Sequence, residues 1–255
     1  MNAITGFTSQ QESHKHSLET LQMLEDHIDF MDSIDSVCDM GCGEGLDIEW
    51  WATRTIDNDD GVTPLNIKCT GIDLTETISI ADKYDNIKYQ QRDFEELSID
   101  QYDVIWSHNS FQYALRPLDT LKCWNRMITN GGMLALIIPQ TTNIQYNRQA
   151  FEVPNYHYFN YTLPTLMYML AVNGFDCSDG FLEKSMSDHW IKAVVYKSDI
   201  EPMDPRTTSW YTLAEKGLLP KTAVDSITAH GYLRQRDLIL SWLNGSATWY
   251  GREWM

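Results

Sequence analysis

The chain has 255 residues, of which 43% are hydrophobic and 12% are aromatic. This length and composition suit a globular, enzyme-sized domain and exclude a disordered chain. The 36 acidic residues outnumber the 19 basic ones, which gives a formal net charge of −17. Lys and Arg form no cluster in the sequence. Nucleic acid is therefore disfavoured as a partner, because proteins that grip its phosphates carry a basic face.

The five cysteines are scattered and contain no C-x-x-C pair. This spacing disfavours a structural zinc site and indicates reduced thiols, so we expect no metal. The N-terminus lacks a basic region followed by an apolar one, and no apolar run reaches membrane-spanning length. We therefore expect no signal peptide, no membrane partner and a cytoplasmic location.

The first predicted element is a helix that begins after residue 9. Ser9 and Glu12 form a capping-box pattern. Apolar residues recur at helical spacing on one side of the helix, at Leu18, Leu21, Leu24, Ile28 and Met31. His14 and His16 lie in a polar run, and we interpret them as solvated rather than catalytic.

A glycine-rich turn follows a short apolar run in the segment SVCDMGCGEGL (36–46). Gly41, Gly43 and Gly45 allow a sharp turn and the close approach of a ligand to the backbone. The run does not fit the dinucleotide fingerprint G-x-G-x-x-G, because position 46 is leucine. It also lacks the Gly-Lys-Ser/Thr ending of a P-loop. We therefore expect a ligand that is not held by its phosphates.

Further strand patterns follow the glycine turn and alternate with helical ones. The Asp-rich segment 56–61 between them is interpreted as an exposed turn. The strand patterns lie at 67–75, 86–97, 101–113 and 128–140. This alternation predicts parallel strands joined by crossover helices, with a ligand at the carboxyl ends of the strands.

In this order, the glycine turn and the four strand patterns resemble the class I S-adenosylmethionine-dependent methyltransferases over about residues 15–198. The resemblance implies a Rossmann-like, doubly wound, mostly parallel seven-stranded α/β sheet with an antiparallel closing strand. It implies S-adenosyl-L-methionine as cofactor, with Asp73 accepting from the ribose hydroxyls and Asp93 from the adenine amino group. The cofactor-binding residues that it implies are Asp39, Gly41, Cys42, Gly43, Asp73, Leu74, Asp93, Phe94 and Ser107.

The domain organisation follows from the extent of this resemblance. We expect a methyltransferase domain at 1–198 and a helical extension at 199–255 packed on it. The aromatic connection 140–161 is interpreted as a lid over the acceptor pocket, with a satellite core as the alternative. Three short helices are expected in the extension, ending near Gly217, Gly231 and Gly245. We favour docking on the sheet with a contribution to the substrate pocket, and a homodimer surface is the alternative.

The predicted activity is methyl transfer to N or O of a small-molecule acceptor. Candidates for a general base are His108 and Tyr113 in the loop at the end of the third strand pattern, and His157 in the aromatic lid. The loop SHNSFQY (107–113) lacks the Asn/Asp-Pro-Pro-aromatic sequence of adenine amino methylation and the cysteine of cytosine C5 methylation. Two alternatives stay open: a non-catalytic binding or assembly partner with this fold, and a protein or RNA methyltransferase.

Overall fold

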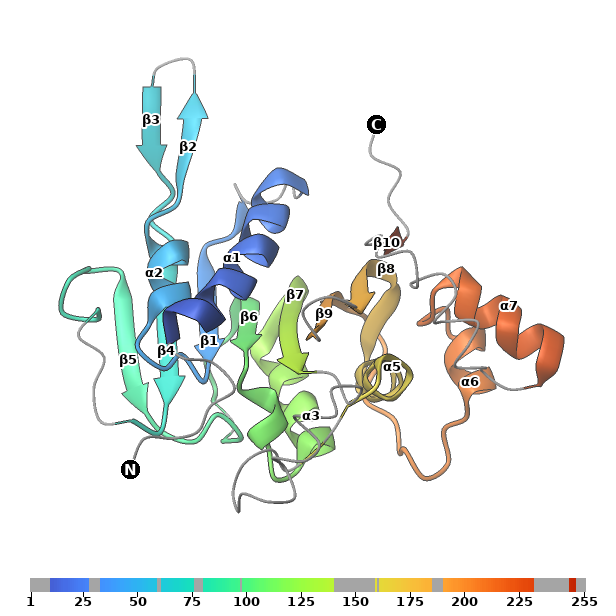
Figure 1. The fold of residues 1–255 in the computed structure, drawn as a ribbon. Coiled ribbons are helices and arrows are strands. Elements are labelled where there is room, and N and C mark those ends of the chain that lie inside the picture. The colour runs from blue at the N-terminus through green and yellow to red at the C-terminus, as the bar shows by residue number, and fades with distance from the viewer. Residues whose placement is uncertain are drawn as a thin grey trace.

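The computed structural model describes residues 10–27, 33–58, 61–75, 80–96, 98–139, 159, 161–184, 190–231 and 248–250. A central eight-stranded sheet has the strand order β10-β8-β9-β7-β6-β1-β4-β5 (Figure 1). Its strands, in chain order, are β1 (Ser36–Met40), β4 (Lys68–Asp73), β5 (Ile87–Gln91), β6 (Tyr102–His108), β7 (Ile128–Pro139), β8 (Phe175–Lys184), β9 (Trp190–Lys197) and β10 (Thr248–Tyr250).

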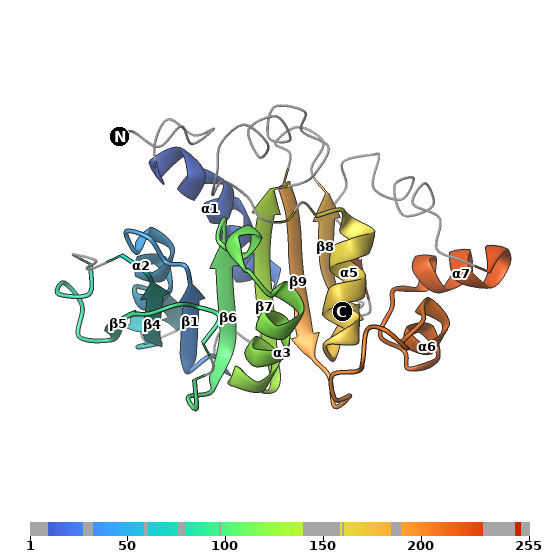
Figure 2. The ribbon, with the colours of Figure 1, turned by 90° about the horizontal axis from the view of Figure 1, so that it is seen from below.

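Helices cover both faces of the sheet. In Figures 1 and 2, α1 and α2 lie on one face, and α3 and α5 lie on the other. The helices are α1 (Gln10–His27), α2 (Leu46–Ala52), the short 3-10 helix η2 (Phe111–Tyr113), α3 (Pro117–Met127), α5 (Leu163–Val172), α6 (Trp210–Glu215) and α7 (Lys221–His230). The molecule is therefore a three-layer α/β structure.

Strand pairing matches the predicted doubly wound sheet. The five strands β5, β4, β1, β6 and β7 pair in parallel. β9 then pairs antiparallel to β7 and β8. The predicted seven-stranded arrangement with an antiparallel closing strand is confirmed, and the three-residue β10 adds an eighth strand beside β8. β10 was not predicted, because three residues are too few to form a periodic pattern.

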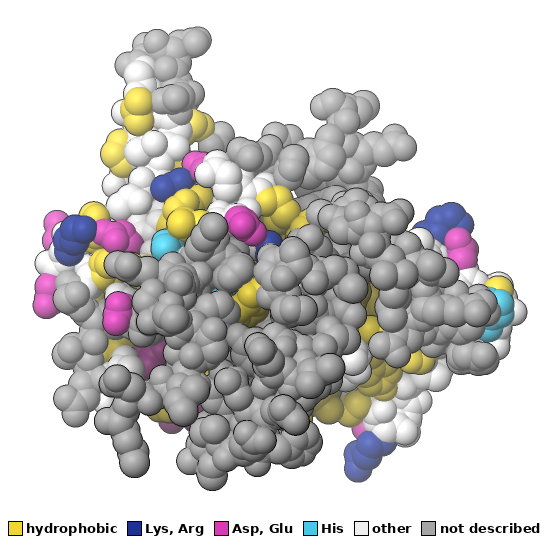
Figure 3. Space-filling view, viewed as in Figure 1, with side chains coloured by type: hydrophobic (Ala, Val, Ile, Leu, Met, Phe, Trp, Pro, Cys, Tyr) yellow, Lys and Arg dark blue, Asp and Glu magenta, His cyan; other side chains and the backbone are white. Residues whose placement is uncertain are grey.

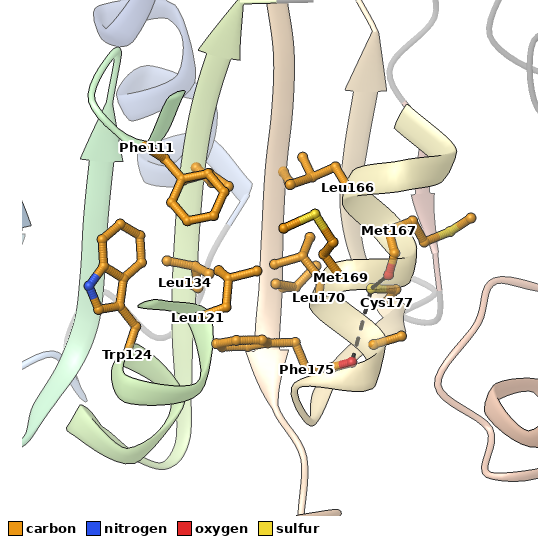
Figure 4. Close-up of a cluster of buried hydrophobic side chains, with 14 of the residues drawn as sticks. Phe111, Leu121, Trp124, Leu134, Leu166, Met167, Met169, Leu170, Phe175 and Cys177 are labelled. Atoms are coloured by element: carbon orange, nitrogen blue, oxygen red, sulfur yellow. Dashed lines mark hydrogen bonds between the residues drawn. The ribbon is translucent and has the colours of Figure 1, made fainter. Parts of the chain in front are cut away.

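Alternating strand residues form two hydrophobic clusters, one on each face of the sheet. On β7, Leu134 and Leu136 join the cluster under α3 and α5, whereas Met133 and Ala135 join the cluster under α1 and α2. Figure 4 shows the first cluster, where Phe111, Leu121 and Trp124 lie on one side and Leu166, Met167, Met169 and Leu170 of α5 lie on the other. Both sheet faces are thus buried, as expected for a parallel sheet between helical layers.

A two-stranded hairpin projects from the sheet between α2 and β4 (Figure 1). It consists of β2 (Thr55–Asn58) and β3 (Gly61–Pro64), which pair antiparallel. The prediction of a turn over all of 56–61 is wrong, because residues 56–58 lie in β2 and Gly61 begins β3. The residues of β3 are exposed, so this hairpin adds little to the core.

The leading helix lies over α2 and contributes Leu21 and Leu24 to the hydrophobic cluster on that face. Leu18, predicted on the same apolar side, is instead 38% exposed. The predicted contributions of Ile28 and Met31 lie outside the described residues. In the part of the chain that the structure describes, no helix is both long and apolar enough to cross a membrane.

The described helices of the C-terminal extension, α6 and α7, lie beyond β8. Figures 1 and 2 both place them at the opposite edge of the sheet from β4 and β5. Leu213, Leu218 and Ile227 join the cluster under α5. The predicted helix near Gly245 lies outside the described residues.

Candidate functional site

The glycine turn connects β1 to α2 at the carboxyl end of the sheet. Gly41, Gly43 and Gly45 have φ angles of 81°, 53° and 85°, a left-handed region that disfavours residues with a Cβ. The N–H groups of Gly41 and Cys42 both donate to the Ile72 carbonyl, at 2.8 and 3.1 Å. The turn is therefore fixed to β4, the strand that ends in Asp73.

Gly41 also meets the loop after β6. A Cβ added at Gly41 would lie 2.3 Å from the Cβ of Ser110. The Ser110 hydroxyl donates to the Met40 carbonyl at 2.5 Å. The Ser107 hydroxyl lies 2.6 Å from Ser110 Oγ, to which it can donate, and 3.3 Å from the same carbonyl. The carboxyl ends of β1 and β6 are thus held together through buried serine hydroxyls, and Ser107 lies directly beside the glycine turn.

Asp73 ends β4 and accepts hydrogen bonds from two backbone groups. Gly43 N–H donates to Oδ2 at 2.9 Å, and Thr75 N–H donates to Oδ1 at 3.0 Å. Each carboxylate oxygen has two lone pairs, so both oxygens keep the capacity to accept one further bond. Leu74, the next residue, is 67% exposed.

Asp39 lies in β1 and is 1% exposed. Its Oδ2 atom has no hydrogen-bond partner among the described residues. Burial raises the pKa of Asp39 well above its ordinary value, and the nearby charges of Asp47 and Asp73 raise it further. A cation bound beside this carboxyl would stabilise its ionised form.

Asp93 and Phe94 follow β5 and are held against α3. The Asp93 carboxylate accepts from the N–H of Glu95 at 2.9 Å, and Trp124 Nε1 donates to the Phe94 carbonyl at 2.9 Å. Phe94 and Trp124 also make an edge contact with ring centroids 5.9 Å apart. This strand end thus presents one carboxylate and one aromatic ring, each of them half-buried.

The three catalytic candidates fall in different places. His108 ends β6, and its side chain is 8% exposed. Tyr113 ends η2 and is half-buried. His157 lies outside the described residues, as does nearly all of the predicted lid at 140–161.

Asp47, in the first turn of α2, forms a polar cluster that the sequence reasoning missed. Its Oδ1 accepts from His14 Nδ1 and from Ser17 Oγ, both at 2.5 Å. Its Oδ2 accepts from Trp106 Nε1 at 3.0 Å and from His108 Nδ1 at 3.1 Å. Burial alone would raise the pKa of Asp47, but the hydrogen bonds from His108, His14 and Ser17 outweigh it and hold the pKa below its ordinary value.

The interpretation of His14 as a solvated residue is wrong, since its side chain is 20% exposed and bound to Asp47. His14 and Asp47 lie 33 positions apart, and Asp47 and His108 lie 61 apart. No local pattern joins residues at such separations. The one feature of the sequence that could have indicated this contact is that His14 lies in a helix that precedes β1, because such a helix can pack beside the turn after β1.

The described residues suit the cofactor that the resemblance implied. Asp39 has an unpartnered oxygen that can accept from an ammonium group, and Asp73 can still accept from a diol. The space beside Gly41 tolerates no side chain. Asp93 and Phe94 supply an acceptor and an aromatic ring at the next strand end. These groups line up along the carboxyl ends of β1, β4 and β5, as a nucleoside attached to an amino acid requires.

Comparison with solved structures supports the same fold. One match is a putative S-adenosylmethionine-dependent methyltransferase from Listeria monocytogenes, with 17% identity and a TM-score of 0.51, covering 70% of this chain and 97% of the other. A chain in the complex of the Haloferax volcanii Trm112 methyltransferase activator with a putative methyltransferase has 15% identity and a TM-score of 0.53, with coverage of 69% and 93%.

A third match is an S-adenosylmethionine-dependent methyltransferase from Archaeoglobus fulgidus, with 15% identity, a TM-score of 0.51 and coverage of 69% and 92%. No protein with a curated description matches the sequence. A family model described as a methyltransferase domain matches residues 38–136, which run from β1 to β7 and include the glycine turn, Asp73, Asp93 and His108. Residues 38–136 therefore match the methyltransferase-domain family, and the described part of the chain shares its fold with S-adenosylmethionine-dependent methyltransferases.

Proposed function

We propose that this protein transfers the methyl group of S-adenosylmethionine to an oxygen or nitrogen atom of a small-molecule acceptor. The observation that carries the proposal is the bond between the Asp73 carboxylate and the Gly43 N–H, at 2.9 Å. It joins the turn after β1 to the acidic end of β4, so the proposed site for the amino-acid end of the cofactor and the proposed site for its ribose belong to one unit. Bound there, the cofactor would supply an electrophilic methyl group.

The protein's own residues have three tasks in this reaction. Asp39, the glycine turn and Ser107 hold the amino-acid end, and Asp73 holds the ribose. Asp93 and Phe94 hold the adenine. An acceptor must then be oriented beside the carboxyl end of β6, where His108 lies, because alignment of nucleophile and methyl carbon supplies much of the rate.

Charge favours a small acceptor over nucleic acid. The formal net charge is −17. Described Lys and Arg side chains on the face in Figure 3 lie at separate places rather than in one patch. A phosphate backbone would gain little from such a surface. A screen of acceptors with a labelled methyl group distinguishes this proposal from the non-catalytic and protein-directed alternatives.

Calorimetric titration with S-adenosylmethionine and S-adenosylhomocysteine tests the cofactor site. Asp73→Asn is preferable to Asp73→Ala, because asparagine keeps one oxygen for the glycine turn while losing the bidentate carboxylate. We expect binding by the wild type and at least a tenfold weaker affinity in the variant, about 1.4 kcal/mol. Asp176→Asn is the matched control, since Asp176 also accepts a backbone N–H, from Ser178 at 2.8 Å, but lies on β8.

Acceptors are then screened with a labelled methyl group. Transfer to phenols, hydroxybenzoates or aromatic amines supports the proposal. Cofactor binding without transfer to any small molecule, protein or RNA would favour the non-catalytic alternative. Absence of cofactor binding by the wild type would overturn the proposed function altogether.

A further inference from the structure

Two histidines form hydrogen bonds to the same buried carboxylate, that of Asp47 in the first turn of α2. His14 comes from α1 and His108 from the end of β6, and both direct Nδ1 at Asp47. Ser17 and Trp106 occupy further acceptor positions on the same carboxylate. Asp47 thus accepts bonds on both oxygens from four side chains, which fixes its orientation.

The charges around this cluster are acidic. The titratable groups that influence it are Asp39 in β1 and Glu49 in α2, besides the two histidines themselves. Among the described residues, the ion pairs of Asp47 involve only His14 and His108. Asp47 can therefore balance a positive charge on one of these imidazoles. In the described part of the chain, no lysine or arginine forms an ion pair with Asp47.

The hydrogen bonds fix which ring nitrogen is basic. An ionised carboxylate only accepts, so the proton of a neutral His14 or His108 lies on Nδ1, and the Nε2 lone pair becomes the proton acceptor. The side-chain hydrogen bonds of His14 to the described part of the chain all involve Nδ1. No described residue bonds its Nε2, which is therefore the atom that can accept a proton from a ligand.

The two rings differ in access. The His108 side chain is 8% exposed and packs against Trp190, with ring centroids 5.6 Å apart. The His14 side chain is 20% exposed and comes from the helix that covers this face of the sheet. Of the two, His14 is better placed to meet an incoming acceptor, and His108 is better placed to hold Asp47.

We propose that His14 is the general base of the methyl transfer and that Asp47 is its positioning residue, an inference that rests on the proposed function. The acceptor's oxygen or nitrogen forms a bond to the methyl carbon while the carbon–sulfur bond breaks, and that electron pair stays on sulfur as the thioether. The acceptor's proton passes to His14 Nε2 and then to solvent. His108 supports the arrangement through Asp47. The acceptor class is accordingly a hydroxyl or N–H group that is protonated at neutral pH.

Nuclear magnetic resonance of ¹⁵N-labelled histidines tests the geometry without cofactor or turnover. In the wild type above the histidine pKa range, the neutral His14 ring is expected to carry its proton on Nδ1. In Asp47→Ala it should move toward the Nε2–H form that free histidine prefers. A wild-type His14 in the Nε2–H form would overturn the proposal, because its basic nitrogen would then face Asp47.

Turnover tests the role directly, with labelled S-adenosylmethionine and a panel of phenols, hydroxybenzoates and aromatic amines. His14→Gln should bind cofactor normally but lose kcat by about 100-fold or more, with a smaller change in KM. The rise of kcat with pH, as the base loses its proton, should disappear. Added imidazole should restore part of the activity of His14→Ala, which a purely structural role would not allow.

His230→Gln is the matched control, because His230 is an exposed histidine at the end of α7. It should leave kcat and its pH profile unchanged. Wild-type turnover in His14→Gln, or loss of the pH dependence in His108→Gln alone, would overturn the assignment of His14 while the proposed function stands. Failure of the wild type to transfer a methyl group to any acceptor would overturn both.

Discussion

Gly41 and Ser110 lie so close that a Cβ on the glycine would be 2.3 Å from the Cβ of the serine. The contact joins the turn after β1 to the loop after β6. Because Gly41 has no side chain, the turn presents only backbone atoms at this position, where β1 and β6 end. An alanine at position 41 must therefore displace one of the two loops.

We expect Gly41→Ala to weaken binding of S-adenosylhomocysteine by at least tenfold, or about 1.4 kcal/mol. Gly131→Ala is a matched control: Gly131 has φ 80°, against 81° for Gly41, but nothing lies within 4 Å of its added Cβ. Both variants carry the same backbone strain, and only one carries the clash. Equal affinities of the two variants, measured by calorimetry, would contradict this account.

Binding of the cationic cofactor should release a proton from Asp39. Burial raises the pKa of this carboxyl, so it holds its proton at a pH where an ordinary aspartate has lost it. A neighbouring ammonium or sulfonium group favours the ionised form and lowers that pKa. Affinity should therefore rise with pH above the ordinary aspartate range, until Asp39 is ionised in the free protein.

Calorimetry in two buffers with different ionisation enthalpies measures the released proton directly. Asp39→Asn cannot ionise, so its observed binding enthalpy should lose the part of the buffer dependence that Asp39 supplies. Identical proton release by the wild type and this variant would assign the proton to another group.

Asp47 should stabilise the fold at neutral pH and lose that effect in acid. Its pKa is lower in the folded protein than the ordinary value of 3.8. A lowered folded-state pKa stabilises the folded state above the unfolded-state pKa, and the contribution disappears as pH falls through the folded value. We expect Asp47→Asn to reduce the free energy of unfolding by about 2–3 kcal/mol at pH 7, from the loss of charge-assisted hydrogen bonds.

Urea unfolding followed by tryptophan fluorescence tests this expectation. The difference between the wild type and Asp47→Asn should narrow as pH falls below 3.8. Asp225→Asn serves as the control, because Asp225 pairs with Lys221 on the surface of α7, with both side chains largely exposed. A difference that is constant with pH would mean that Asp47 acts by packing alone.

Trp124 should link the hydrophobic cluster to the expected adenine side of the site. It packs against Phe111, with centroids 5.5 Å apart, and its Nε1 donates to the Phe94 carbonyl. Trp124→Ala should lower the free energy of unfolding by about 3–5 kcal/mol, because it opens a cavity in a fully buried position. Trp124→Phe keeps an aromatic ring but removes the hydrogen bond, at about 1 kcal/mol.

The two variants separate packing from positioning. Trp124→Phe should remain folded at 25 °C and yet bind S-adenosylhomocysteine more weakly than the wild type, since Phe94 loses its anchor. Unchanged affinity in this variant would show that the Phe94 loop is held by other contacts. Circular dichroism and calorimetry together provide both measurements.

The sequence by itself predicted the parts of the molecule that depend on neighbours along the chain. The glycine spacing at 41, 43 and 45 and the apolar strands before Asp73 and His108 identified the sheet and the strand ends. The cap of α5 is equally local, since the Thr162 side chain accepts from the Thr165 N–H. Caps, turns and periodicity are local, so a single sequence is enough to read them.

Tertiary structure decided what the strand ends and helices bring together. The three residues of β10 form a strand because they pair with β8, a partner that is distant in the sequence. The meeting of His14, Asp47 and His108 depends on how α1 folds over α2 and on the parallel register of β1 and β6. Side chains 33 and 61 positions apart meet because the chain folds back on itself, and the burial of one carboxylate among their donors has no counterpart in the linear sequence.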